Sequence, residues 1–208
     1  MSNTAQNGEL FVVSSPSGAG KSAILSRARA DDPSLLFSVS ATTRPPRKGE
    51  QDGREYYFLE RDEFMRRVDA GEFIEWAEVH GNLYGTLRSE MDRLAASGHD
   101  AIIEIDVQGA ASLREQACTM VSVFIMPPSL EELERRLLGR GTETPEVVAL
   151  RIGNARHELE QYRHYDFVVV NDDLDTAVAD FKAIIRARRC RVERFADVPE
   201  GGVRAAIE

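Results

Sequence analysis

The chain has 208 residues, of which 42% are hydrophobic and 29% charged, and its formal net charge is −9. This length suits one domain with a sizeable core, and the composition excludes collagen-like, disordered and membrane-embedded proteins. Binders of nucleic-acid polymers usually carry positive charge, so we expect no nucleic-acid partner. Residues 1–8 show neither the basic region nor the apolar stretch of a signal peptide, and no apolar run is long enough to cross a bilayer. We therefore expect a cytoplasmic protein with no membrane partner.

The first predicted elements are a strand, a glycine-rich turn and a helix. Residues 10–14 (LFVVS) are typical of a short buried strand, and residues 15–22 (SPSGAGKS) follow directly. A helix then runs to about Asp32-Pro33. Strand, glycine loop and helix in this order indicate the start of an α/β fold.

Residues 15–22 nearly match the phosphate-loop pattern G-x-x-x-x-G-K-[ST], with Ser15 in place of the first glycine. The backbone N–H groups of such a loop, together with the start of the next helix, form an anion site. Lys21 would reach the β- and γ-phosphates, and the Ser22 hydroxyl would bind Mg²⁺, partly through water. The alternative is a glycine-rich turn that happens to contain lysine, which the flanking strand and helix disfavour. The loop alone leaves ATPases, GTPases, kinases and motors open.

The next segment has a different rhythm. Strand-like pieces occur at residues 36–40, 56–59 and 73–79, with a polar loop at 42–55 and an amphipathic helix at 62–70. These features predict a small β-rich insertion.

The α/β rhythm returns after residue 100. Strands are predicted at residues 101–105, 120–125 and 167–170. Ser129 and Glu132 form a capping-box pattern for one helix, and Thr144-Pro145 has the start signature of another. A last helix carries an apolar stripe between Ala177 and Ile185. The predicted fold class is α/β, with a parallel sheet flanked by helices and one β-rich insertion.

Three stretches identify a family. Residues 40–57 (SATTRPPRKGEQDGREYY), 73–86 (FIEWAEVHGNLYGT) and 104–109 (EIDVQG), taken with the phosphate loop, resemble the guanylate kinases in order and spacing. The resemblance covers nearly the whole chain, from about Gly8 to the last helix. It implies a single P-loop domain with a core (8–37, 88–129 and 161–195), a GMP-binding region (38–87) and a helical lid (130–160). The implied reaction is ATP + GMP to ADP + GDP with Mg²⁺, and the resemblance leaves open whether dGMP is also an acceptor.

The resemblance also implies residue roles. Arg44, Arg47, Tyr56 and Tyr84 would hold the GMP phosphate, whereas Ser40, Glu75, Thr86 and Asp106 would contact or orient guanine. An arginine fork matches two phosphate oxygens, and a carboxylate accepts from guanine N1–H and its 2-amino group. Taken singly, each residue has an ordinary explanation: solvated loop arginines, packed tyrosines, or an exposed strand face for Glu75. The family spacing favours the functional interpretation.

The remaining implied residues lie on the donor side. Arg136, Arg140 and Arg151 would belong to a lid that closes over the ATP phosphates, and Glu132 with Arg136 is alternatively an ordinary surface pair. Asn171 would meet the adenine, and Glu104 would help to position hydrated Mg²⁺. The residues expected to act in catalysis are Lys21, Arg44, Arg136, Arg140 and Arg151. The residues expected to bind ATP are Ser15, Pro16, Ser17, Gly18, Ala19, Gly20, Lys21, Ser22 and Asn171.

Two other functions remain open from the residues. One is a P-loop kinase for another small phosphate acceptor, such as a phosphorylated ribose, against which Glu75 and Asp106 argue. The other is a non-catalytic, peptide-binding module of guanylate-kinase type, against which the phosphate loop and the lid arginines argue. Both a monomer and a homo-oligomer are compatible with the sequence.

Overall fold

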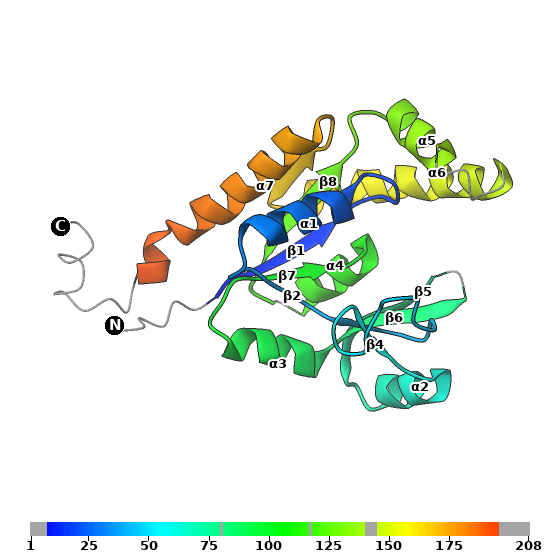
Figure 1. The fold of residues 1–208 in the computed structure, drawn as a ribbon, viewed down its shortest axis with the longest axis vertical. Helices are drawn as coiled ribbons and strands as arrows, with labels where there is room; N and C mark the ends of the chain where they lie inside the picture. Colours follow the sequence, from blue (N-terminus) through cyan, green and yellow to red (C-terminus); the bar gives the residue numbers. More distant parts are fainter. Residues whose placement is uncertain (1–7, 80, 117, 140–144, 196–208) are drawn as a thin grey trace.

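The computed structural model describes residues 8–79, 81–116, 118–139 and 145–195. Within these ranges the chain forms two sheets and the helices that cover them (Figure 1). The larger sheet is parallel, with strand order β2-β7-β1-β8-β9. Its strands are β1 (Leu10–Ser14), β2 (Leu36–Phe37), β7 (Ala101–Glu104), β8 (Val121–Met126) and β9 (Phe167–Val170). The predicted α/β fold class is confirmed.

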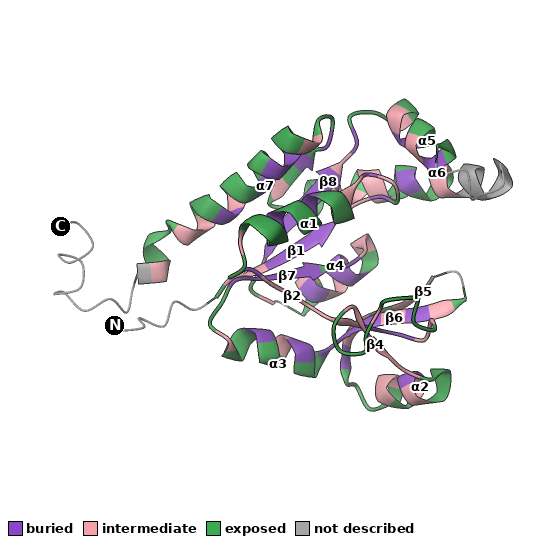
Figure 2. Cartoon of the chain, in the orientation of Figure 1, coloured by how far each residue is buried: buried purple, intermediate pink, exposed green. Residues whose placement is uncertain are grey.

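Helices cover both faces of the parallel sheet. Phe11 and Val13 pack in one cluster with α1 (Lys21–Asp31) and α7 (Leu174–Arg189). Val12 points to the opposite face, where α4 (Val107–Glu115) contributes Leu113. Successive strand side chains point to opposite faces, so a parallel sheet covered on both sides is apolar throughout its length. Figure 2 shows the resulting burial of the central strands β7, β1 and β8. On the edge strand β9, Val168 and Val170 are exposed.

The second sheet is the β-rich insertion. Its order is β4-β3-β6-β5, from β3 (Ser40–Thr42), β4 (Tyr56–Phe58), β5 (Phe73–Val79) and β6 (Asn82–Leu87). Helix α2 (Arg61–Asp69) packs on it through Phe64, whose ring stacks on Phe73 at 4.3 Å between centroids. Helix α3 (Arg88–Ala96) leads back to the parallel sheet.

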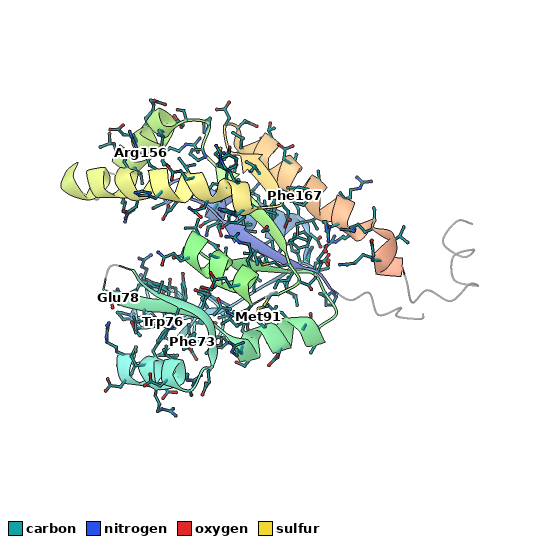
Figure 3. The ribbon with its side chains drawn as sticks, turned by 180° about the vertical axis from the view of Figure 1, so that it is seen from behind. Phe73, Trp76, Glu78, Met91, Arg156 and Phe167 are labelled. Carbon is teal, nitrogen blue, oxygen red and sulfur yellow. The ribbon has the colours of Figure 1, made fainter. Side chains whose placement is uncertain are left out.

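Two further helices stand beside the phosphate loop. They are α5 (Leu130–Leu138) and α6 (Pro145–Glu160), joined by an apolar contact of Leu133 and Leu137 with Ala155. Short 3₁₀ turns follow at Gln161–His164 and Val192–Phe195. Viewed from behind, α4 lies between α6 and the second sheet (Figure 3). No described helix is both long enough and apolar enough to cross a bilayer.

Several element predictions need correction. The strand predicted at 36–40 is two strands in different sheets, β2 and β3, because the chain leaves one sheet for the other at residues 38–39. Strand β6 and helices α3 and α4 were not predicted. Ser129 does cap α5, accepting from the Glu132 N–H at 3.1 Å, but the Glu132 carboxylate pairs with arginines instead of completing a capping box. Thr144 lies outside the described residues.

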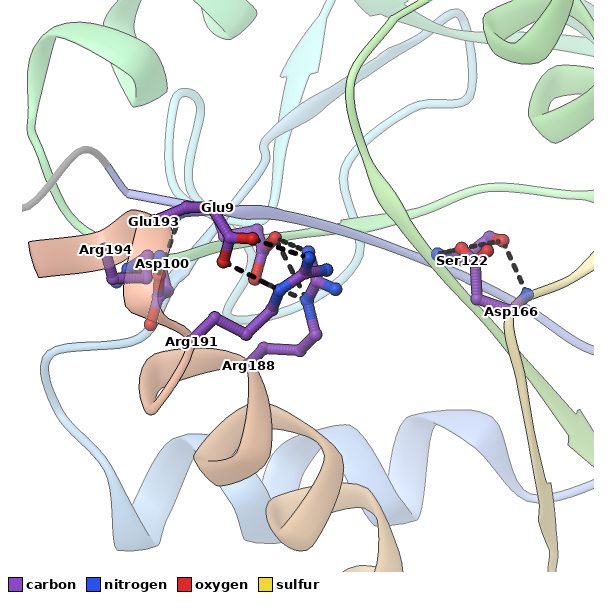
Figure 4. A network of polar contacts seen from close by, with 8 residues as sticks. All are labelled: Glu9, Asp100, Ser122, Asp166, Arg188, Arg191, Glu193 and Arg194. Atoms are coloured by element: carbon purple, nitrogen blue, oxygen red, sulfur yellow. Dashed lines mark hydrogen bonds and ion pairs between the residues drawn. The ribbon is translucent and has the colours of Figure 1, made fainter. Parts of the chain in front are cut away.

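Ion pairs gather at the amino ends of β1 and β7, the end of the parallel sheet opposite the phosphate loop (Figure 4). Asp100 is 5% exposed and accepts hydrogen bonds from Glu9 N–H (2.9 Å), Arg189 Nε (2.6 Å) and Arg194 Nη1 (2.8 Å). Arg188 pairs with the Glu9 carboxylate. Burial alone would raise the pKa of Asp100, but the bonds from Arg189, the Glu9 N–H and Arg194 outweigh burial and lower it. These bonds fasten α7 and the last 3₁₀ turn to the sheet.

Candidate active site

The loop between β1 and α1 has the backbone of an anion cradle. Gly18 and Gly20 adopt positive φ angles of 90° and 89°, which glycine tolerates far better than other residues. Ala19 N–H donates to Pro16 C=O at 3.1 Å, and α1 begins immediately after Gly20. The loop therefore presents backbone donors at a helix N-terminus, where phosphate groups bind readily.

Lys21 and Ser22 meet Glu104 at the end of β7. Lys21 Nζ lies 3.3 Å from Glu104 Oε1, and Ser22 Oγ donates to the same oxygen at 3.4 Å. This contact follows from topology, because β1 and β7 are parallel neighbours whose carboxyl ends share one edge of the sheet. The edge thus combines a cation, a hydroxyl and a carboxylate beside the loop.

A cavity of about 330 Å³ opens at this edge and is shared by the two sheets. The phosphate loop supplies one wall, the end of β7 the floor, and the second sheet the opposite wall. Its lining residues are Lys21, Ser22, Ser38, Ser40, Glu55, Tyr56, Glu75, Ala77, Tyr84, Gly85, Glu104, Ile105 and Asp106. Eight residues predicted from the sequence, Glu104 among them, are therefore brought together. A larger groove of about 820 Å³ lies between α1 and α7 and contains none of them.

Two carboxylates form the inner end of the cavity. Glu75 on β5 accepts a hydrogen bond from the Thr86 hydroxyl at 2.7 Å, and Thr86 is 1% exposed. Burial raises the pKa of Glu75, and the nearby charge of Asp106 adds to this effect. Asp106 is the N-cap of α4 and accepts from Gly109 N–H at 2.8 Å. Glu75 is thus turned inward and does not belong to an exposed strand face.

Gly109 makes room for Glu75. A Cβ atom on Gly109 would lie 3.0–3.1 Å from the end of the Glu75 side chain, which is closer than ordinary contact. The first turn of α4 consequently holds both carboxylates, Asp106 as its cap and Glu75 against its backbone.

Arg44 is held by a carboxylate of its own loop. Its guanidinium makes a two-pronged pair with Glu50, at 3.0 Å and 2.9 Å, and lies 5.3 Å from the centroid of the Tyr56 ring. The pair with Glu50 raises the pKa of Arg44. The backbone N–H of Arg47 donates to the same carboxylate at 2.6 Å, while the Arg47 side chain is exposed. The loop is therefore folded around Glu50, and Arg44 is fixed beside the cavity rather than solvated.

The sequence model of the guanylate kinase family matches residues 7–188. The chain belongs to the guanylate kinase family. A guanylate kinase from Symbiobacterium thermophilum is 51% identical over 187 residues, which cover 90% of this chain and 89% of that protein. One from Cereibacter sphaeroides is 47% identical over 93% of each chain. The crystal structure of guanylate kinase from Anaplasma phagocytophilum superposes with a TM-score of 0.70 at 37% identity, covering 91% of this chain and 90% of that one. The family and enzyme class predicted from the sequence are confirmed.

Asn171, which follows β9, connects the phosphate loop to α5. Its side-chain amide donates to Ala19 C=O of the phosphate loop at 2.7 Å, and its own C=O accepts from Arg136 Nη2 at 2.9 Å. Arg136 also pairs with Glu132 at 2.7 Å, as the surface-pair alternative states. Asn171 thus contacts the loop backbone here, and its role at adenine stays a prediction.

Of the other two arginines predicted to belong to a lid, only Arg151 lies within the described residues. Arg151 lies on α6, which packs on α5, and Arg140 lies outside the described residues. Bonds from Arg135 and then Arg136 lower the pKa of Glu132 to about 2, so this carboxylate stays charged at neutral pH.

Sequence reasoning missed Glu50 and Gly109 as site residues. The signal for Glu50 was its place in the same Pro/Gly loop as Arg44, since a buried arginine requires an acidic partner. The signal for Gly109 was a glycine inside a helical stretch, which often marks a close approach of another group.

Proposed function

We propose that the chain transfers the terminal phosphate of ATP to GMP at the shared cavity. The observation that carries this proposal is the composition of its walls, because the phosphate loop faces the second sheet across one space. Membership of the guanylate kinase family supports both substrates. The products would be ADP and GDP.

The donor side would be the phosphate loop, residues 15–22. Its N–H groups and Lys21 would hold the β- and γ-phosphates of ATP. The Asn171 side-chain amide would hold the loop backbone in place through its hydrogen bond to Ala19 C=O. Arg136, Arg140 and Arg151 would stabilise the charge that develops on the transferring group.

The acceptor phosphate would lie against Arg44, Arg47, Tyr56 and Tyr84. Glu50 occupies one edge of the Arg44 fork, and Tyr56 and Tyr84 meet edge to face at 6.1 Å beside it. This packing holds the guanidinium rigid, so that less side-chain freedom is lost when a phosphate binds.

Guanine would lie at the inner end, with Ser40, Glu75, Thr86 and Asp106. A carboxylate only accepts hydrogen bonds, and guanine offers donors at N1 and at its 2-amino group. Adenine has no N1–H and would leave Glu75 without that donor, at a cost of about 1.5–3 kcal/mol. The discrimination against AMP is then roughly tenfold to a hundredfold for each lost bond.

The Ser22 hydroxyl and the Glu104 carboxylate, 3.4 Å apart, are hard oxygen groups of the kind that suit Mg²⁺ together with phosphate oxygens and water. When bound, Mg²⁺ would neutralise charge on the ATP phosphates. The binding test is a calorimetric ATP titration with and without Mg²⁺. Mg²⁺ should tighten ATP binding to the natural chain and should do so much less in Ser22→Ala.

The function is tested by a coupled assay of ADP release with GMP, dGMP, AMP, UMP and ribose phosphates. GMP should be the preferred ribonucleotide, and equal rates with AMP would refute the guanine assignment. Arg44→Ala should raise KM for GMP by roughly tenfold to a hundredfold and leave KM for ATP nearly unchanged. Arg61→Ala is the matched control, because this arginine of α2 is 54% exposed and pairs with Glu78.

A further inference from the structure

We infer that Glu90 is a positioning residue for the acceptor site and that it fixes the second sheet on the parallel core. Glu90 lies in the first turn of α3, and its side chain is only 1% exposed. It does not line the cavity and no step of the proposed reaction uses it. A buried carboxylate outside the cavity needs a structural reason, and its partners supply one.

The hydrogen bonds of Glu90 come from three directions. Oε1 accepts from Val39 N–H at 2.8 Å and from Arg93 Nη2 at 2.7 Å. Oε2 accepts from the Tyr57 hydroxyl at 3.2 Å and from Arg93 Nε at 2.9 Å. Burial alone would raise the pKa of Glu90, but the bonds from Arg93 and Val39 lower it, so the group is a charged carboxylate at neutral pH.

These partners lie where the chain passes between the two sheets. Residues 38–39 connect β2 of the parallel sheet to β3 of the second sheet. Helix α3 makes the return connection from β6 to β7. Glu90 on the return connection binds Val39 on the outgoing one, and it also binds Tyr57 on β4, one of the two edge strands of the second sheet. One carboxylate therefore ties both connections and the edge strand together.

The tied segments carry the acceptor wall of the cavity. Val39 stands between Ser38 and Ser40, and Tyr57 follows Tyr56. Ser38, Ser40 and Tyr56 all line the cavity. Because strand side chains alternate between faces, Tyr57 is held from one face of β4 while Tyr56 points into the cavity from the other.

None of the partners of Glu90 belongs to the phosphate loop. Loosening this contact should therefore displace Ser40 and Tyr56 and leave Lys21 and its loop in place. The inference rests on the proposed function, since it assumes that this wall binds GMP.

The test compares GMP and ATP affinity, each measured alone by calorimetry, in three changed chains. Glu90→Gln keeps an acceptor for Val39 N–H but loses the charge that holds Arg93. Its Kd for GMP should rise by about tenfold, and its Kd for ATP should stay within about twofold of that of the natural chain. Glu90→Ala loses every one of these hydrogen bonds and should weaken GMP binding further. Glu90→Gln would then be a partial rescue relative to Glu90→Ala. Tyr57→Phe removes one hydroxyl and should raise the Kd for GMP by a few fold, which is the effect of losing about one neutral hydrogen bond.

Glu63→Gln is the control. Glu63 is a paired carboxylate of the same region, on α2, and its partners Arg66 and Arg67 lie on the same helix. Both affinities should stay unchanged. If Glu90→Gln weakens the binding of ATP and of GMP equally, or weakens neither, the positioning role is overturned. If the Glu90 variants fail to fold, Tyr57→Phe decides, and an unchanged GMP affinity in that variant overturns the inference.

Arg44→Ala separates this inference from the proposed function. If Arg44→Ala leaves GMP affinity unchanged, the acceptor site itself is misplaced. If Arg44→Ala weakens GMP but Tyr57→Phe and Glu90→Gln do not, the acceptor site stands and only the role of Glu90 is wrong.

Discussion

Gly109→Ala is expected to weaken GMP binding without unfolding the protein. The new Cβ would lie 3.0 Å from Glu75 Oε2 and 3.1 Å from its Cδ and Cγ, so the carboxylate must move by a few tenths of an ångström. Alanine favours the helix over glycine by about 0.5–1 kcal/mol, whereas crowding a packed site costs about 1–3 kcal/mol. The net change in the free energy of unfolding is therefore small, and Tm should fall by less than about 10 °C.

The effect on binding should be larger than the effect on stability. A displaced Glu75 would lose the proposed charged hydrogen bond to guanine, which is worth about 1.5–3 kcal/mol, or roughly tenfold to a hundredfold in Kd. Calorimetric titration with GMP measures this directly, and a titration with ATP reports on the phosphate loop. The matched control is Gly153→Ala in α6, where a Cβ would meet nothing within 4 Å. If Gly109→Ala binds GMP as tightly as the natural chain, Glu75 does not read the base from this position.

Further results are expected for Lys21, Asp100 and Glu75. Lys21→Ala should lower kcat by about a hundredfold or more with Tm unchanged, and near-normal turnover would refute the role of the phosphate loop. Asp100→Asn should lower Tm by roughly 3–12 °C, because it removes charged bonds to Arg189 and Arg194. The folded pKa of Asp100 is lowered, so its stabilisation is present above the unfolded value of 3.8 and should disappear as pH falls below that value. The pKa of Glu75 is raised by burial and by the charge of Asp106, so GMP affinity should begin to fall on acidification at a higher pH than a glutamate of ordinary pKa would cause. Glu75→Gln, measured over the same pH range, should lack this component.

The parts of the fold that the sequence predicts well are those with a strong local pattern. The buried strand β1, the glycine loop and α1 follow from adjacent residues, and Asp106 follows from its place after an apolar strand. Strand β6 was missed because its Gly85 breaks the apolar alternation. That glycine is needed where a Cβ would lie 2.7 Å from Glu75 C=O and from the Phe73 ring. The break at residues 38–39 was missed because neighbouring strand-like residues give no sign that they enter different sheets.

Contacts between distant segments explain the remaining differences between the prediction from the sequence and the observed structure. Asn171 lies 152 residues from Ala19, which it contacts, and Glu90 lies 51 residues from Val39. No local periodicity encodes such pairs. Arg44 and Glu50 are close in the chain, yet their pairing depends on how the loop folds between them. The family resemblance predicts the residues of this site, and the structure adds the contacts that hold those it describes.

The two inner carboxylates of the cavity are unequal, and their surroundings indicate which one depends more on the base. Asp106 accepts the Gly109 N–H and lies at the positive end of α4, so the helix already stabilises its charge. Glu75 is stabilised by Thr86 and lies near the charge of Asp106, which together with burial raises its pKa. A hydrogen bond from guanine to Glu75 would stabilise a carboxylate charge that its surroundings disfavour. A hydrogen bond from guanine to Asp106 would only add to the stabilisation that the helix already gives that charge. Glu75 is therefore expected to contribute more than Asp106 to the preference for guanine over adenine. A Glu75→Gln chain should lose more of the GMP-to-AMP preference than an Asp106→Asn chain, and the reverse order would contradict this reasoning.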